Sequence, residues 1–134
     1  MNDVFKMLVD GINAQPDLPQ KVKPGFLQAD DAFGLYPTKS GQTVDEDFAG
    51  NQEKRLYFEA AIRTQKQGLG NSLMWLVSTY IDQLTDLPSD SFRFLRAEAT
   101  SEPAISQADL QGYVVYSFDF AVNIMVNKYA KRKE

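Results

Sequence analysis

The sequence contains no histidine and no cysteine. Without histidine the chain lacks the commonest general base, the Ser-His-Asp arrangement and the commonest zinc ligand. Without cysteine it can form no disulfide and offers no thiolate, which fits a reducing compartment such as the cytoplasm. These two absences predict a protein that is not an enzyme, holds no metal and needs no cofactor.

Long apolar runs and an excess of basic residues are missing too. Polar residues interrupt every apolar stretch, and the N-terminal residues include acids and amides, so we expect neither a membrane span nor a signal peptide. The formal net charge of −4 argues against a surface that binds the phosphates of nucleic acids. The basic tail at residues 128–134 is the exception, and we interpret it as a solvated terminus.

What the sequence does contain is enough apolar material for one core. The chain has 134 residues, of which 43% are hydrophobic and 12% aromatic, so we expect a single domain over residues 1–134. Along the chain, the spacing of apolar residues alternates between the period of a helix and the period of a strand. The expected elements are a helix at 1–14, a strand at 53–64, a helix at 71–85 capped by Asn71, a strand at 91–99, a loop at 100–112 and a strand at 113–127.

This order of elements predicts an α+β domain, in which an N-terminal helix and a central helix pack on an antiparallel or mixed β-sheet. Leu76 in the central helix and Phe120 in the last strand are expected to lie buried between helix and sheet. We expect residues 25–52 to form a protruding segment, which is either a hairpin that turns at Ser40-Gly41 or an irregular loop.

The last strand, at 113–127, is long for a chain of this size. At about 3.3 Å per residue it would measure close to 50 Å, whereas a compact chain of this length has a radius of gyration of about 14 Å. We therefore expect the strand to bend, or to share part of its edge with a neighbouring molecule.

Three residue patterns are candidates for chemistry, and each has a simpler explanation. Glu59 and Asp119 could face each other on neighbouring strands, but acids on the wetter face of a sheet are usually ordinary surface residues. The cluster Asp45-Glu46-Asp47 begins like a calcium loop, yet the fifth and twelfth positions are Ala49 and Leu56, so we expect a solvated loop.

The third pattern is Gly68-Leu69-Gly70, which lies between a strand and a helix as phosphate-binding loops do. The third glycine of a dinucleotide-binding fingerprint is replaced by Leu73, and no lysine of a phosphate loop follows. We interpret these glycines as a flexible turn that leads into the helix capped by Asn71.

A surface for other protein subunits is the better prediction. Tyr57 has Arg55 and Arg63 near it on the outer face of the strand at 53–64, together with Glu59. Tyrosine and arginine are enriched at protein interfaces, so these four residues are the predicted subunit contact, with the segment at 36–50.

As a whole, the pattern resembles the tail terminator proteins of long-tailed bacteriophages, a group that includes minor capsid proteins. The segments that carry the resemblance are the strand EKRLYFEAAIRT, the helix NSLMWLVSTYIDQL, the strand SFRFLRAEAT, the loop with Pro103 and the strand GYVVYSFDFAVNI. Together they cover nearly the whole chain.

The resemblance implies a virion protein of the tail–neck junction, assembled in the cytoplasm of the host bacterium. It implies a ring of identical subunits, usually a hexamer, that caps the tail tube protein, stops its polymerisation and joins a head-completion or neck protein. DNA would pass through such a ring without specific binding, and Asp45, Glu46 and Asp47 are candidates to line the channel or face the tail. The alternatives are another neck or tail-completion protein, or a small-molecule-binding α+β domain with a pocket between helix and sheet.

Overall fold

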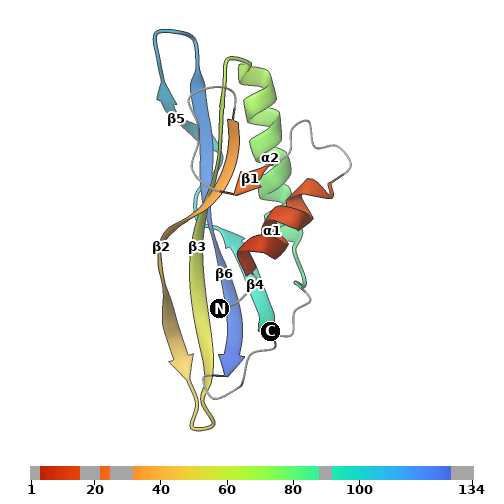
Figure 1. Cartoon of the computed structure of the whole chain (residues 1–134), viewed down its shortest axis with the longest axis vertical. Helices are drawn as coiled ribbons and strands as arrows, with labels where there is room; N and C mark the ends of the chain where they lie inside the picture. Colours follow the sequence, from red (N-terminus) through yellow and green to blue (C-terminus); the bar gives the residue numbers. More distant parts are fainter. Residues whose placement is uncertain (1–3, 16–21, 25–31, 88–91, 128–134) are drawn as a thin grey trace.

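The protein has two helices and a six-stranded sheet in the part of the chain that the structure describes. This computed structural model describes residues 4–15, 22–24, 32–87 and 92–127. The elements are α1 (Val4–Asn13), β1 (Lys23–Pro24), β2 (Ala32–Glu46), β3 (Asn51–Thr64), α2 (Gln67–Gln83), β4 (Arg93–Ala99), β5 (Ala104–Ala108) and β6 (Val114–Asn127). Both helices lie on one side of the sheet, and neither is long and apolar enough to cross a membrane (Figure 1). The predicted α+β class is confirmed.

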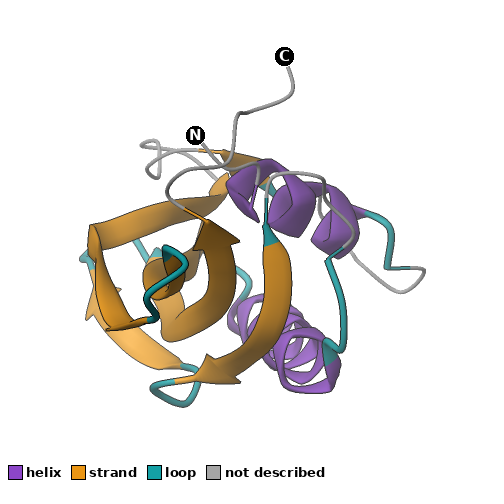
Figure 2. Ribbon diagram, turned by 90° about the horizontal axis from the view of Figure 1, so that it is seen from below, coloured by secondary structure: helices purple, strands orange, loops and turns teal. Residues whose placement is uncertain are grey.

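The sheet is built around the pairing of β3 with β6. The strand order is β1-β2-β3-β6-β4, and β5 pairs with the part of β6 that β4 leaves uncovered. All neighbours are antiparallel except β1 and β2, so the sheet is mixed. It coils strongly, as the end-on view in Figure 2 shows.

The long last strand bends with this coil, and its edges are not open. β3 pairs with all of it, from Asn51 opposite Asn127 to Thr64 opposite Val114. On the other edge β4 pairs with residues 120–125 and β5 with residues 114–117. The prediction of a loop over residues 100–112 was therefore wrong in part. Residues 104–108 form β5, which is the second partner of the long strand on this edge.

The core lies between the helices and one face of the sheet. Val4, Leu8 and Ile12 of α1 are fully buried, at the period of one helical stripe. Stacked phenylalanine rings join α1 to the sheet, from Phe5 to Phe58 (6.1 Å between ring centroids) and from Phe58 to Phe120 (5.5 Å). From the sheet and α2 the fully buried side chains include those of Leu35, Ile62, Leu73, Met74, Val77, Ile81, Phe118, Phe120 and Ile124.

The protruding segment is a hairpin, but it turns at Asp47–Gly50 and not at Ser40-Gly41. β2 continues through Gly41, where the register with β3 shifts between Lys39 and Gln42. A Cβ on Gly41 would lie 2.6 Å from the Leu56 side chain and 3.1 Å from the Arg55 carbonyl oxygen. This glycine therefore permits a close approach within a bulged strand, as glycines in strands often do. Residues 25–31 of the predicted segment lie outside the described residues.

The central helix begins one turn earlier than predicted. Lys66 is its N-cap, and Asn71, expected to cap it, lies inside α2 together with Gly68 and Gly70. The two glycines are therefore not a flexible turn. Gly70 is buried, and a Cβ there would lie 2.6 Å from the Tyr116 ring and 3.2 Å from the Thr64 methyl group, so the helix approaches β6 closely at this point.

We expect Gly70→Ala to destabilise the fold by about 1–3 kcal/mol, because the added methyl group must displace the buried Tyr116 ring. Gly68→Ala is the matched control. Nothing lies within 4 Å of a Cβ at Gly68, so there the better helix propensity of alanine should stabilise by up to about 1 kcal/mol. Urea denaturation of both variants measures the two effects. Equal changes for the two variants would contradict the close approach at Gly70.

Candidate functional site

The sheet face opposite the helices is polar and forms a connected surface, which we call the polar face. On β3 its residues alternate with the core residues Phe58, Ala60 and Ile62. The four residues predicted as a subunit contact lie on this face, and they are Arg55, Tyr57, Glu59 and Arg63. All four side chains are partly exposed.

Arg55 belongs to a network that crosses three strands. Its Nη1 lies 2.6 Å from Glu98 Oε1 on β4 and donates to Asn123 Oδ1 on β6 at 2.9 Å. Asn123, which is buried, donates in turn to Glu53 Oε2 (2.7 Å), and Glu53 pairs with Arg96 (3.0 Å). The hydrogen bond to Glu98 raises the pKa of Arg55, which keeps its charge. Sequence reasoning named Arg55 but missed these partners, since they come from strands more than 40 residues away along the chain.

Arg63 is held at the other end of β3. Its Nη2 lies 2.8 Å from Asp109 Oδ2, and its guanidinium stacks 3.9 Å from the centre of the Tyr113 ring. Only 18% of the side chain is exposed. Both predicted interface arginines are therefore already paired within the chain, and a change at either affects the fold as well as any contact with a neighbour.

Glu59 and Asp119 face each other, as the sequence suggested they could. They are direct partners in the register of β3 and β6, and Tyr36 Oη on β2 donates a hydrogen bond to Glu59 Oε1. Burial raises the pKa of Glu59, and the neighbouring Asp119 carboxylate raises it further, although the hydrogen bond from Tyr36 acts in the opposite sense. Burial and the Glu59 carboxylate also raise the pKa of Tyr36.

This acid pair is a contact within the sheet. In the described residues no group of three or more acidic side chains is placed to hold a metal ion. The groove described below lies on the helix side, away from this pair.

We expect Glu59→Gln to raise the melting temperature at pH 7 by about 3 °C and to leave it unchanged near pH 4. The raised pKa of Glu59 means that its protonated form stabilises the fold below the ordinary value of 4.5, and that this stabilisation is lost as the pH rises through the raised value. Glutamine stays uncharged at every pH. Thermal denaturation from pH 4 to pH 8 measures the difference, and a difference that does not change with pH would contradict the prediction.

The acidic residues Asp45, Glu46 and Asp47 lie at the tip of the β2–β3 hairpin. Asp47 Oδ1 accepts hydrogen bonds from the backbone N–H groups of Ala49 (2.9 Å) and Asn51 (3.0 Å), and Oδ2 accepts one from the Asn51 side chain. The side-chain bond from Asn51 contributes most to a lowered pKa of Asp47. Asp47 is therefore a structural residue of the turn, while Asp45 and Glu46 supply exposed charge beside it.

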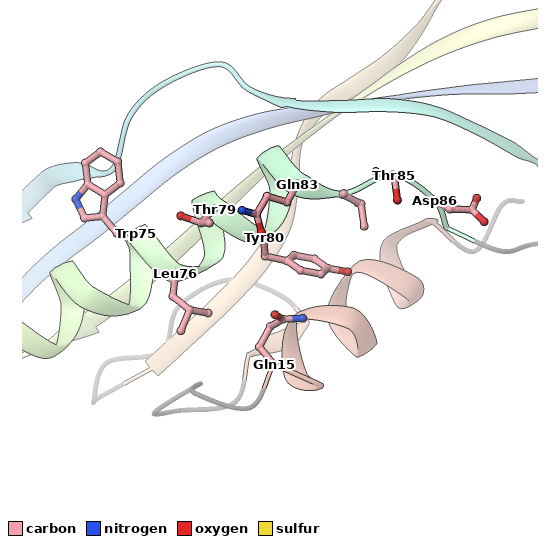
Figure 3. A pocket seen from close by; sticks show the side chains of 9 residues that line it. Gln15, Trp75, Leu76, Thr79, Tyr80, Gln83, Thr85 and Asp86 are labelled. Carbon is pink, nitrogen blue, oxygen red and sulfur yellow. The ribbon is translucent and has the colours of Figure 1, made fainter.

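The structure also contains a groove that the sequence did not predict. It has a volume of about 590 Å³ and lies along α2, next to the end of α1 (Figure 3). Its lining residues are Gln15, Trp75, Leu76, Thr79, Tyr80, Gln83, Leu84, Thr85 and Asp86. Leu76 was predicted to lie buried between helix and sheet, but it is only half-buried at the edge of the core and lines this groove, because α2 turns Leu73, Met74 and Val77 to the sheet instead. Core side chains occupy the space between helix and sheet in which the small-molecule alternative expected a pocket.

The fold and the polar face together define a class: an α+β protein with a polar sheet face whose residues are paired across strands. Residues 26–126 match the family model of the bacteriophage tail terminator protein. No curated protein matches the sequence. Since the family match spans most of the chain, the protein belongs to the bacteriophage tail terminator family. It is a structural protein of the phage tail, as the resemblance in its sequence predicted.

Proposed function

We propose that the protein forms a closed ring of six subunits. The ring caps the finished tail tube, stops addition of the tube protein and presents a surface for a head-completion or neck protein. The observation that carries this proposal is the match to the tail terminator family over residues 26–126. The ring sits at the tail–neck junction of the virion after assembly in the host cytoplasm, and DNA passes through it.

The free edges of the sheet support a ring. Beyond Leu35, no described strand pairs with the outer edge of β2, and none covers the outer edges of β4 and β5. These edges lie on opposite sides of the sheet because β3 and β6 separate them. A contact between the β2 side of one copy and the β4–β5 side of the next joins two different patches, and such a heterologous contact closes into a ring when its rotation divides the circle.

The subunit contact in this proposal combines the β2 edge from Tyr36 to Glu46 with the neighbouring polar face, including Arg55, Tyr57, Glu59 and Arg63. Partly exposed arginine and tyrosine side chains suit an interface that is polar at its rim. The acidic residues Asp45, Glu46 and Asp47 line the channel or face the tail, where negative charge would repel the phosphates of passing DNA.

The purified protein should form closed rings, and rings added to growing tail tubes should stop their extension at normal length. Negative-stain electron microscopy of the protein alone and with tubes measures both outcomes. Deletion of its gene should give over-long tails that do not join heads. Normal tails from the deletion strain would refute the proposed function.

A charge swap separates a role of Arg55 between subunits from its role within the chain. Arg55→Glu alone should cost about 1 kcal/mol, because it breaks the pair with Glu98. The double variant Arg55→Glu, Glu98→Arg restores a pair within the chain and should recover most of that stability. We expect the double variant still to lose its rings, since the charge offered to the neighbouring subunit is reversed. Recovery of both stability and rings would remove Arg55 from the proposed contact.

A further inference from the structure

Two turns of the protein are built in the same way. In the first, at Asp47–Asn51, the Asp47 N–H donates to the Asn51 carbonyl oxygen (3.0 Å) and the Gly50 N–H donates to the Asp47 carbonyl oxygen (3.2 Å). The Asp47 carboxylate accepts the N–H groups of Ala49 and Asn51. Gly50 has φ 84°, which favours glycine. Side-chain and main-chain bonds therefore hold this turn in one conformation.

The second turn, at Asp109–Tyr113, repeats each of these contacts. The Asp109 N–H donates to the Tyr113 carbonyl oxygen (2.9 Å), and the Gly112 N–H to the Asp109 carbonyl oxygen (3.3 Å). Asp109 Oδ1 accepts the N–H groups of Gln111 (2.9 Å) and Tyr113 (3.0 Å), and Gly112 has φ 88°. Burial alone would raise the pKa of Asp109, but these bonds and Arg63 outweigh it and lower the pKa.

Each turn presents a large apolar side chain directly after its aspartate. Phe48 has a relative exposure of 110% and Leu110 of 106%, so nothing in the described part of the subunit covers either side chain. The turn itself needs only the aspartate and the glycine. Single exposed apolar residues are common, but here two rigid turns of the same design both hold one out into solvent. A side chain on a preformed turn loses little backbone freedom when it binds.

The two turns lie at opposite ends of the molecule. Asn51 ends the first turn and pairs with Asn127, whereas Tyr113 ends the second and leads into Val114, which pairs with Thr64 at the far end of β3. The 14 residue pairs between them span about 43 Å. Figure 1 shows the two hairpin ends at the bottom and the top of the long axis. Phe48 and Leu110 of one subunit therefore meet different surroundings.

We propose that Phe48 and Leu110 are two anchors, one at each end of the subunit, and that each inserts into an apolar pocket on a different virion protein. This rests on the proposed function, in which a ring lies between tail tube and neck. Charge distinguishes the two pockets. The exposed Asp45 and Glu46 flank Phe48, so its pocket has a basic rim, while Asp109 beside Leu110 is paired with Arg63, so that pocket has an uncharged rim.

A second copy of this chain is a poorer partner for the acidic tip. Among the described residues that line the groove on α2, Asp86 is charged and none is basic, so these residues would repel the charges around Phe48. A separate protein with Lys or Arg around an apolar pocket fits the tip better. Buried aromatic and aliphatic anchors of this kind dominate the affinity of many interfaces.

Phe48→Ser and Leu110→Ser are the test variants, and Trp75→Ser is the control. The control removes an apolar residue with 47% exposure that lies on α2, away from both turns and from the sheet edges of the proposed ring contact. All three variants are introduced into the phage, and tails and heads are counted by electron microscopy. We expect both test variants to fold with an unchanged melting temperature and to lower the yield of infectious particles at least about tenfold.

The two anchors should fail at different steps, because they meet different partners. One variant should give over-long tails, and the other should give tails of normal length that do not join heads. The Trp75→Ser control should assemble like the parent. Normal yields from either test variant, arrest of both at the same step, or equal loss in the control would overturn the inference.

The gene deletion separates this inference from the proposed function. If deletion gives over-long, unjoined tails but the Phe48→Ser and Leu110→Ser genes restore normal particles, the terminator function stands and the anchors are wrong. If deletion leaves normal tails, the function itself is wrong, and the variants are then expected to be normal for that reason.

Discussion

The pairing of β3 with β6 over 14 residue pairs is the interaction on which the rest of the structure depends. One face of this two-stranded ribbon carries Phe58, Phe118, Phe120 and Ile124, and both helices pack on it. A two-stranded ribbon is not stable alone in water, so the burial of this face supplies the favourable free energy that fixes the register. A shift by one residue would turn the phenylalanines to solvent and place Glu59 and Asp119 in the core.

The same pairing organises the polar face. Because the register sets Arg55 opposite Asn123 and Glu59 opposite Asp119, charged groups from distant parts of the sequence meet in fixed geometry. Exposed ion pairs of this kind contribute little stability each. Their effect is to fix side-chain positions, since Arg55 and Arg63 have defined positions before any neighbour binds. A surface organised in advance loses less side-chain freedom on assembly, which suits a protein of the tail terminator family.

The length of the ribbon also separates two ends. A shorter strand pair would bring the Asp47 and Asp109 turns closer together, whereas about 43 Å of paired strand lies between these two. In the described residues, no strand covers the outer edges of β4 and β5 or, beyond Leu35, that of β2. In the proposed ring between tube and neck, the sides of the subunit contact copies of itself and its two ends contact other proteins.

The sequence by itself determined the α+β class, the helix at Val4–Asn13 and the two long strands, because these depend on local apolar periodicity. It also indicated the tail terminator family and the outer face of β3. Only the tertiary structure decided where the hairpin turns, since Ser40-Gly41 is a good local turn sequence but pairing with β3 continues the strand through it. In the same way, packing against Tyr116 placed Gly70 inside α2, and the uncovered edge of β6 made a strand of residues 104–108. The partners of Arg55 and Arg63, and the position of the two turns at opposite ends of the molecule, depend on contacts between residues far apart in the chain, and no local pattern contains that information.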